Sequence, residues 1–253
     1  MTARPLHCYL LDEDDELVQG VHARMRVAAR KAVTARVIDA EPGQCDLASW
    51  LAATLDGPGL LILDGVLAVD VCVGDRTATE LVGPGDLLQP PDPVAEDLLG
   101  CWATWNALTD VRMALLDAAF AQRVRPWPEI TQALLRRAGR RNASLDAQRA
   151  ISCHPRLEVR LVLLLWHLAS RWGRVEPGGI RLTLPVTHRV LGHVVGAERP
   201  SVSHALSRLA HAGLLTRDGS DWHLHGNVED HIGRLLERQT PANVGVSSRA
   251  DTG

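Results

Sequence analysis

Apolar residues in the first half of the chain occur in short runs separated by glycine-rich turns. Between residues 33 and 82 these runs are rich in β-branched residues, and the clearest are Leu60–Leu63 and Val66–Val73. Turn sequences such as Asp64-Gly65 and Gly83-Pro84-Gly85-Asp86 lie between or after them, and glycine accepts the positive φ of a tight turn. Short strands at this spacing predict a small β-sandwich or barrel, with a tight hairpin at Asp64-Gly65.

The pattern becomes helical after Ala107. Residues 107–122 are rich in helix formers, and residues 126–152 carry an apolar stripe opposite a basic one. The apolar stripe consists of Ile130, Leu134, Leu135 and Ala138, and the basic stripe of Arg136, Arg137, Arg140 and Arg141. A long helix with such a stripe packs it against a second copy of the chain or, alternatively, within its own chain. His154-Pro155 predicts a break, and Gly173 ends an apolar helix over Arg156–Trp172.

The segment Leu182–His225 has the order helix, turn, helix, hairpin. Thr183 is placed to cap a first helix, whose inward residues are Val186, Val190 and Leu191. Gly196-Ala197 predicts a tight turn, and the second helix spans residues 199–212, with Gly213 as its stop. Two short strands around Asp218-Gly219-Ser220 follow. This order predicts a winged helix-turn-helix.

The second helix leaves a polar set of side chains outside its core positions, which are Val202, Leu206 and Leu209. Serine permits close approach to a duplex, and arginine can donate two hydrogen bonds to guanine or one to a phosphate. We therefore predict binding to double-stranded DNA. The predicted DNA-binding residues are Arg199, Ser201, Ser203, His204, Ser207 and Arg208, together with Thr183 and Arg217. The alternative is a small helical domain or a winged helix that contacts only proteins.

Length and charge set limits on the other classes of protein. The chain has 253 residues, about twice the usual size of a domain, so we expect two domains and a connecting element. The net charge of -3 gives no global basic field, and no apolar run approaches the ~20 residues of a membrane span. Met1–Leu11 contains one arginine and precedes the acidic run Asp12–Glu16, unlike a secretory signal. We expect a cytoplasmic protein that does not contact membranes.

Cysteine and histidine spacing gives no metal or catalytic site. The five cysteines contain no CxxC pair, so we expect buried small apolar residues rather than disulfides or metal ligands: Cys8, Cys45, Cys72, Cys101 and Cys153. Most histidines lie between His188 and His231, at spacings suited to surface and wing positions. The predicted strands over residues 33–82 contain no histidine for a cupin-type metal site, and the chain has no GxSxG elbow. We expect no metal and no enzymatic activity.

The chain resembles the cyclic AMP receptor protein and Fnr (Crp/Fnr) family of bacterial transcription regulators over roughly residues 30–226. The segments that carry the resemblance are Gly59–Val69, Leu81–Asp86, Ala107–Arg112 and Gly196–Leu209. The resemblance implies an α+β fold with an N-terminal double-stranded β-helix barrel of the cyclic-nucleotide-binding type and a C-terminal winged helix. It implies a barrel domain over residues 1–125, a dimerisation helix over 126–154 and a winged helix-turn-helix over 155–239. It also implies a homodimer, a two-fold symmetric operator and RNA polymerase as a further partner; we expect residues 240–253 to be a disordered tail.

Two residues depart from the family pattern in the second helix. Pro200 stands where the family commonly has a glutamate that can accept from cytosine, so the operator is expected to differ. His204 occupies a site often held by arginine. Because a neutral imidazole attracts phosphate less than a charged one, we expect DNA affinity to rise as pH falls.

The effector site departs further. Members that bind cyclic nucleotide have a Gly-Glu pair soon after the Gly-Asp turn and an Arg-Ser pair near the end of the barrel, whereas here Asp86 precedes Leu87-Leu88 and Cys101–Asn106 contains no arginine. A buried phosphate without a cation costs several kcal/mol, so we predict no binding of cyclic AMP. Leu87, Leu88, Trp102 and Trp105 are candidates to line an apolar pocket for an unidentified small molecule, or to fill it. The alternative is a regulator that binds DNA without an effector and keeps the barrel as a scaffold.

No cofactor is expected from the resemblance. Iron–sulfur sensing of the Fnr type needs several cysteines clustered near the N-terminus, where only Cys8 lies. For haem, His7, His22, Cys45 and Cys72 form no recognisable ligand pair.

Overall fold

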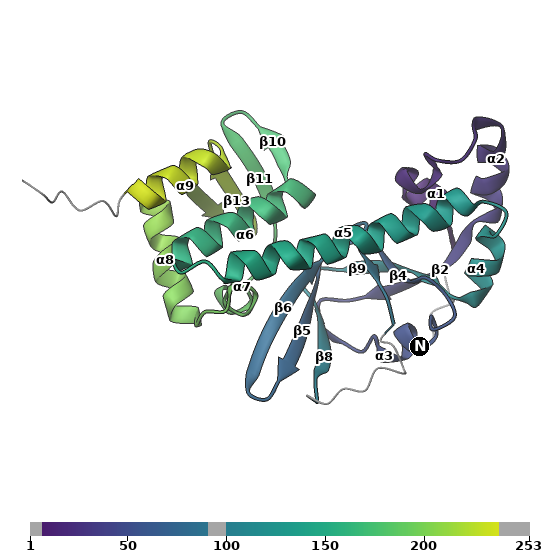
Figure 1. The fold of residues 1–253 in the computed structure, drawn as a ribbon, viewed down its shortest axis with the longest axis horizontal. Helices are drawn as coiled ribbons and strands as arrows, with labels where there is room; N and C mark the ends of the chain where they lie inside the picture. The colour runs from purple at the N-terminus through teal and green to yellow at the C-terminus, as the bar shows by residue number, and fades with distance from the viewer. Residues whose placement is uncertain (1–6, 91–99, 238–253) are drawn as a thin grey trace, which may run out of the picture.

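The computed structural model describes residues 7–90 and 100–237. Two β-sheets form the N-terminal part, and helices with a small sheet form the C-terminal part. The long helix α5 (Pro128–Ser152) runs from one part to the other (Figure 1). The α+β class and the predicted order of barrel, long helix and winged helix-turn-helix are confirmed.

The barrel consists of two antiparallel sheets that face each other. The five-stranded sheet has the order β1 (His7–Tyr9), β2 (Thr34–Ala40), β9 (Val111–Leu116), β4 (Gly59–Asp64) and β7 (Leu87–Leu88). The four-stranded sheet has the order β3 (Gly43–Cys45), β8 (Trp102–Ala107), β5 (Leu67–Val73) and β6 (Arg76–Val82). A core that includes Ile62, Leu67, Val82 and Met113 fills the space between them.

Two local predictions in this domain are wrong. Gly65 has the expected positive φ of +84°, but β4 pairs with β7 and β9 while β5 pairs with β6 and β8, so the chain changes sheets there. The tight hairpin is instead β5–β6, around Gly74-Asp75. The helix predicted over residues 107–122 is largely the central strand β9, and helix α4 (Ala118–Val124) begins only after Asp117. A strand buried on both faces has a continuous apolar run, which periodicity cannot distinguish from a buried helix.

Short helices cover the five-stranded sheet next to α5. They are α1 (Leu10–Glu13), the 3-10 helix η1 (Asp15–Val18) and α2 (Ala23–Ala32), while α3 (Ala48–Ala52) precedes β4. Ile130 and Leu134 of α5 are buried in the core beneath these helices, so the prediction that they pack against a second copy is wrong. Leu135 points out of this core and is 64% exposed.

The C-terminal domain packs directly against the barrel. Val66, Ala68 and Leu81 of the barrel share one apolar core with α6 (Leu157–Trp172). Helix α6 begins after the predicted break at His154-Pro155 and ends at Gly173, as the sequence predicts. The remaining elements are β10 (Arg174–Glu176), β11 (Gly179–Thr183), α7 (His188–Val195), α8 (Arg199–His211), β12 (Leu215–Asp218), β13 (Asp221–His225) and α9 (Val228–Glu237).

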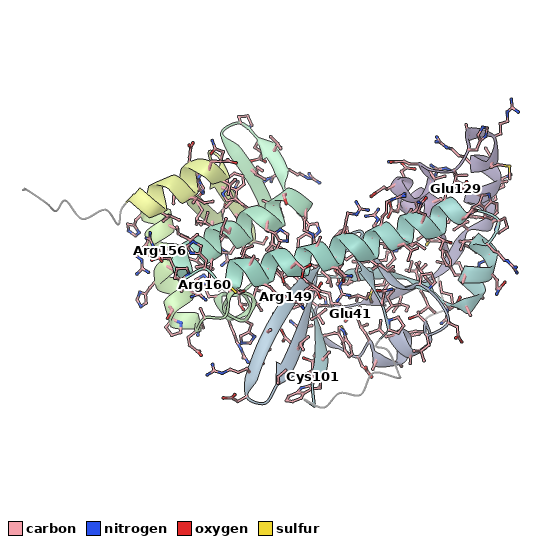
Figure 2. All side chains as sticks on the ribbon, viewed as in Figure 1. Glu41, Cys101, Glu129, Arg149, Arg156 and Arg160 are labelled. Carbon is pink, nitrogen blue, oxygen red and sulfur yellow. The ribbon has the colours of Figure 1, made fainter. Side chains whose placement is uncertain are left out.

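The cysteines differ in exposure. Cys8 is buried and Cys45 and Cys72 are half-buried, but Cys101 and Cys153 are exposed, so the prediction of burial is wrong for the last two. Cys101 lies beside the start of β8 (Figure 2). Across residues 7–90 and 100–237, no helix is both long and apolar enough to cross a bilayer. The predicted tail over residues 240–253 lies outside the described residues.

Candidate nucleic-acid interface

Helices α7 and α8 form the predicted helix-turn-helix, with a different N-cap. The Oγ1 atom of Thr187 accepts a hydrogen bond from the backbone N–H of Val190 at 3.2 Å and so caps α7. Thr183 lies earlier, at the end of β11, and its hydroxyl donates to Asp221 on β13. The prediction that Thr183 caps the helix is therefore wrong. The residue before a proline is disfavoured in a helix, so Pro185 holds Leu184 extended and delays the helix start.

The turn between the two helices is tight because two glycines permit it. Gly196 adopts a left-handed φ of +65°, and a Cβ at Gly192 would lie 2.4 Å from the carbonyl oxygen of Ala197. Arg160 of α6 donates to the carbonyl oxygens of Val195 at 2.7 Å and Gly196 at 3.3 Å. Arg160 lies near the junction of α5 and α6, as Figure 2 shows, so α6 fixes the last carbonyls of α7.

Helix α8 has one buried side and one exposed side, as the sequence predicts. Val202, Leu206 and Leu209 are at most 6% exposed and belong to the core of the C-terminal domain. The exposed side carries five of the eight predicted DNA-binding residues: Arg199, Ser201, His204, Ser207 and Arg208. The barrel leaves this side uncovered, so it is open to a partner.

Ser203 has internal partners although it lies in the same helix. It is half-buried, and its hydroxyl donates to the carbonyl oxygen of Arg199 at 3.1 Å. The Nδ1 atom of His188 lies 2.8 Å from the same hydroxyl. Burial, with the nearby charges of Arg217 and Arg199, lowers the pKa of His188, so its ring is neutral and Nδ1–H donates to Ser203. This pair joins the start of α7 to α8.

Arg208 and Arg217 also have partners within the chain. The Nε atom of Arg208 donates to Glu158 of α6 at 2.8 Å, although the Arg208 side chain stays 62% exposed. Burial raises the pKa of Glu158, but its own backbone N–H and Arg208 outweigh this and hold it below its usual value. Glu158 lies 50 residues from Arg208, so no local pattern could reveal the pair.

Arg217 holds the wing in place. It donates to the carbonyl oxygens of Val186 and Gly219, both at 3.0 Å, and its guanidinium lies 4.4 Å from the ring centroid of Trp222. Burial lowers its pKa. The wing strands β12 and β13 belong to a four-stranded sheet in the order β10-β11-β13-β12, and the predicted turn at Asp218-Gly219-Ser220 is confirmed.

An apolar groove lies on the barrel, where three of the four predicted pocket residues meet. Its volume is about 580 Å³, and Leu88, Trp102 and Trp105 line it with Leu51 and Val69. Trp102 is 52% exposed and lines the groove rather than filling it, while Trp105 is partly buried against the barrel core. Leu87 does not line it; since successive strand residues face opposite ways, Leu87 packs instead in the core under the N-terminal helices.

The cation at the edge of this groove is already paired. Arg141 of α5 lines the groove and makes two hydrogen bonds to Glu80 of β6, from Nε to Oε1 at 2.8 Å and from Nη2 to Oε2 at 2.7 Å. The two side chains are 21% and 11% exposed. Among the described residues, no group of three or more His, Cys, Asp or Glu side chains could hold a metal ion.

The C-terminal domain matches a known family of domains. Residues 159–225 match the family model of the Crp-like helix-turn-helix domain. In sequence the chain is similar to the CRP-like cAMP-activated global transcriptional regulator of Mycobacterium tuberculosis, with 32% identity over 118 residues. That match covers 45% of this chain and 51% of the relative, so the chain spans about half the length of the curated relatives it matches. These relatives are transcriptional regulators.

Solved structures extend the likeness of fold to most of the chain. A transcriptional regulator of the CRP/FNR family from Thermus thermophilus has a TM-score of 0.54 at 21% identity, over 79% of this chain and 98% of its own. A CooA mutant from Carboxydothermus hydrogenoformans has a TM-score of 0.58 at 18% identity, over 81% and 88%. A cyclic nucleotide-binding domain containing protein from Listeria monocytogenes has 0.59 at 15%, over 75% and 88%. At these identities the likeness shows the fold alone.

Proposed function

We propose that this chain, whose C-terminal domain is similar to that of Crp-like regulators, regulates transcription by binding double-stranded DNA through α8. The observation that carries the proposal is the exposed side of α8, where Arg199, Ser201, His204 and Ser207 have no packing role. A helix of this kind fits the major groove, with its N-terminal residues nearest the base edges. The site of action is the cytoplasm, and RNA polymerase is the expected protein partner.

The eight predicted residues divide into two groups. Arg199, Ser201, His204 and Ser207 face outward and are proposed to contact bases and phosphates. Arg208 can meet a phosphate while it stays paired with Glu158, because most of its side chain is exposed. The other three act through position: Ser203 joins the two helices, Arg217 anchors the wing, and Thr183 links β11 to β13.

We propose that the active form is a homodimer joined along α5. The side of α5 that faces away from the barrel and the N-terminal helices includes Leu135, Gly139, Ala143, Asp146 and Ala150, which recur every three to four residues. A second copy packed along this side would place two α8 helices about one helical turn of DNA apart. The expected operator is then two-fold symmetric.

The barrel is proposed to accept an apolar small molecule or none, rather than cyclic AMP. The groove that Leu88, Trp102 and Trp105 line is apolar, and Arg141 at its edge is occupied by Glu80. A phosphate there would have to compete with a buried carboxylate for that guanidinium. Calorimetry with cyclic AMP is expected to give no binding, and micromolar or tighter binding would contradict the proposal.

Selection of bound duplexes from a random pool tests the function directly. Purified chain is expected to enrich a two-fold symmetric motif with half-sites about 10 base pairs apart. Arg199→Ala should weaken binding and relax the preference at one position of each half-site. Arg24→Ala on α2, an exposed arginine far from α8, is the matched control and should leave the motif unchanged. If the chain retains no duplex even at low salt, the winged helix is a protein-interaction module and the proposal fails.

A further inference from the structure

A cleft of about 840 Å³ separates the β5–β6 hairpin of the barrel from α7 and the start of α8. Three arginines from three elements line it: Arg76 directly after the hairpin turn, Arg189 in the first turn of α7, and Arg199 at the start of α8. Arg76 is separated in sequence from the other two by more than a hundred residues, so the fold alone gathers them. The pattern along the chain gave no indication of Arg76 or Arg189.

These arginines differ from the paired arginines of α5 and α6. Within the ranges that the structure describes, the guanidinium groups of Arg189 and Arg199 form no ion pair. Arg76 has its Nε atom 3.8 Å from Asp75, but the side chains are 83% and 92% exposed, and such a pair contributes little to stability. Arg137, Arg141 and Arg171, by contrast, are at most 21% exposed and all paired.

The cleft is mixed in charge, with the cations in excess. Asp75, Glu198 and His193 line it beside the three arginines. Three arginines against Asp75 and Glu198 leave the cleft with a net positive charge, whereas the whole chain carries a net charge of -3. Arginine that its own chain leaves unpaired is suited to bind phosphate, because the guanidinium fork matches two phosphate oxygens.

The hairpin that carries Arg76 is held in a fixed position relative to α8. Strands β5 and β6 pair from Leu67–Val82 to Val73–Arg76, and β6 packs against α7. In helix-turn-helix complexes the first helix crosses the DNA backbone while the second enters the groove. A duplex held by Arg199 would therefore pass Arg189 on α7 and then the tip of the hairpin.

We propose that the barrel takes part in the DNA interface: Arg189 binds a backbone phosphate beside the bases that α8 reads, and Arg76 binds one in the flanking DNA. The inference rests on the proposed function and deepens it, because it extends the same interface beyond the winged helix. DNA is favoured over an acidic protein surface because the cleft opens at Arg199, which itself starts the DNA-reading helix. Such contacts add affinity without adding sequence preference.

Salt dependence of binding on two duplexes tests this. One duplex has long flanks around the selected site and the other is trimmed to the site. The variants are Arg76→Gln, Arg189→Gln and, as the matched control on α2, Arg24→Gln. Each lost phosphate contact should make the negative slope of log K against log salt shallower by about 0.9. The ratio of wild-type to variant affinity should then shrink roughly 3- to 4-fold between 50 and 200 mM salt.

The duplexes separate the two residues. Arg189→Gln should change the slope on both duplexes, since α7 lies beside the site. Arg76→Gln should change it only on the long duplex, because the hairpin reaches flanking DNA. Arg24→Gln should match wild type on both. Because Arg76 is 83% exposed at a hairpin turn, its substitution should leave the melting temperature unchanged.

Each contrary outcome has a definite meaning. If Arg76→Gln binds the long duplex with the same slope as Arg24→Gln, the barrel does not touch DNA and the inference is overturned, while the proposed function stands. If Arg76→Gln reduces transcription without changing DNA binding, the cleft serves a protein partner, and the inference is again overturned. If wild type binds neither duplex at low salt, the proposed function itself has failed.

Discussion

Two serines in α8 show how the same residue type takes different roles two positions apart. Ser201 is exposed, whereas Ser203 is half-buried and bonded to Arg199 and His188. Helical spacing places both outside the core positions, and it correctly identified Val202, Leu206 and Leu209 as buried. It could not reveal the role of Ser203, because His188 approaches from another helix.

His204 is expected to contact DNA. Its side chain is exposed on the side of α8 that is proposed to face the duplex. His204→Ala should therefore weaken binding to a duplex that wild type retains, while its melting temperature stays unchanged. Fluorescence anisotropy with one duplex measures the affinity of both proteins. Equal affinities of wild type and His204→Ala would contradict the prediction.

His167 is expected to make the chain less stable as the pH is lowered. Burial, and then the charge of Arg171, lower its pKa from the usual 6.5. Ser144 accepts from Arg171 at 3.2 Å, so the serine hydroxyl donates to the Nε2 atom of His167 at 2.8 Å, which requires a neutral ring. Above about pH 6.5 both folded and unfolded chains hold this ring neutral. Below about pH 6.5 the unfolded chain takes up the proton first. The free energy of unfolding therefore decreases as the pH is lowered.

The variant His167→Gln isolates this contribution. Chemical denaturation at several pH values between 7.5 and 5.5 should give a shallower loss of stability for His167→Gln than for wild type. The difference in slope cannot exceed about 1.4 kcal/mol per pH unit, the value for one proton. Arg24→Gln, at an exposed position on α2 that does not titrate in this range, is the control and should keep the wild-type slope. Parallel curves for wild type and His167→Gln would exclude the role given to this histidine.

The helix-turn-helix was the most predictable element because its signals are local. Pro200 and Gly213 mark the two ends of α8 to within about a residue, and Gly196 marks the turn. The first helix was placed less well because Thr183 and Thr187 can both cap a helix, and the prediction overlooked Pro185, which disfavours a helical Leu184. Strand β9 was missed for a related reason: its burial on both faces comes from β2, β4 and the helices that cover them, none of which is visible in its own sequence.

The two glycines of the turn should be costly to replace. Gly196→Ala forces a left-handed backbone on a residue with a Cβ, at a cost of about 1–2 kcal/mol. Gly192→Ala should cost more, because its Cβ would meet the backbone of Ala197, and relief would require α8 to shift. Denaturant melts and DNA binding should both show this order. Gly233→Ala, in a helix with nothing within 4 Å of the new Cβ, is the control and should gain up to about 1 kcal/mol. A fully stable Gly192→Ala that still binds DNA would show that the turn tolerates a wider spacing.

At the scale of the whole molecule, the barrel turn at residues 83–86 contacts the long helix α5 and the C-terminal domain, and it lies next to the apolar groove. Asp86 accepts from the backbone N–H of Gly83 at 2.8 Å and from Arg171 of α6, while Arg137 of α5 donates to Gly85. Leu88, two residues after Asp86, lines the apolar groove. The sequence predicted the order of the domains but not this junction, because Asp86 and Arg171 lie 85 residues apart and nothing local marks their pairing.

At the scale of the whole molecule, the proposed dimer is the property on which symmetric DNA reading would depend. Leu135 on α5 is 64% exposed and points away from the chain's own core, so burial against a second copy would remove a large apolar side chain from water. Leu135→Glu would place a charge in that interface. Sedimentation equilibrium should show wild type at twice the chain mass of 27.5 kDa and Leu135→Glu at the single mass. Affinity for a symmetric duplex should fall at the same time, because two half-sites then bind two separate chains.

A matched substitution separates assembly from a general effect of removing an exposed apolar residue. Val27 on α2 is 66% exposed, close to the value for Leu135, and lies outside α5. Val27→Glu should therefore leave both the mass in solution and the DNA affinity unchanged. A wild-type protein that stays monomeric at micromolar concentration, or a Leu135→Glu variant that stays dimeric with its melting temperature intact, would move the dimer contact away from α5. The two α8 helices would then lack the spacing that places them in successive major grooves, and the two-fold operator would lose its structural basis.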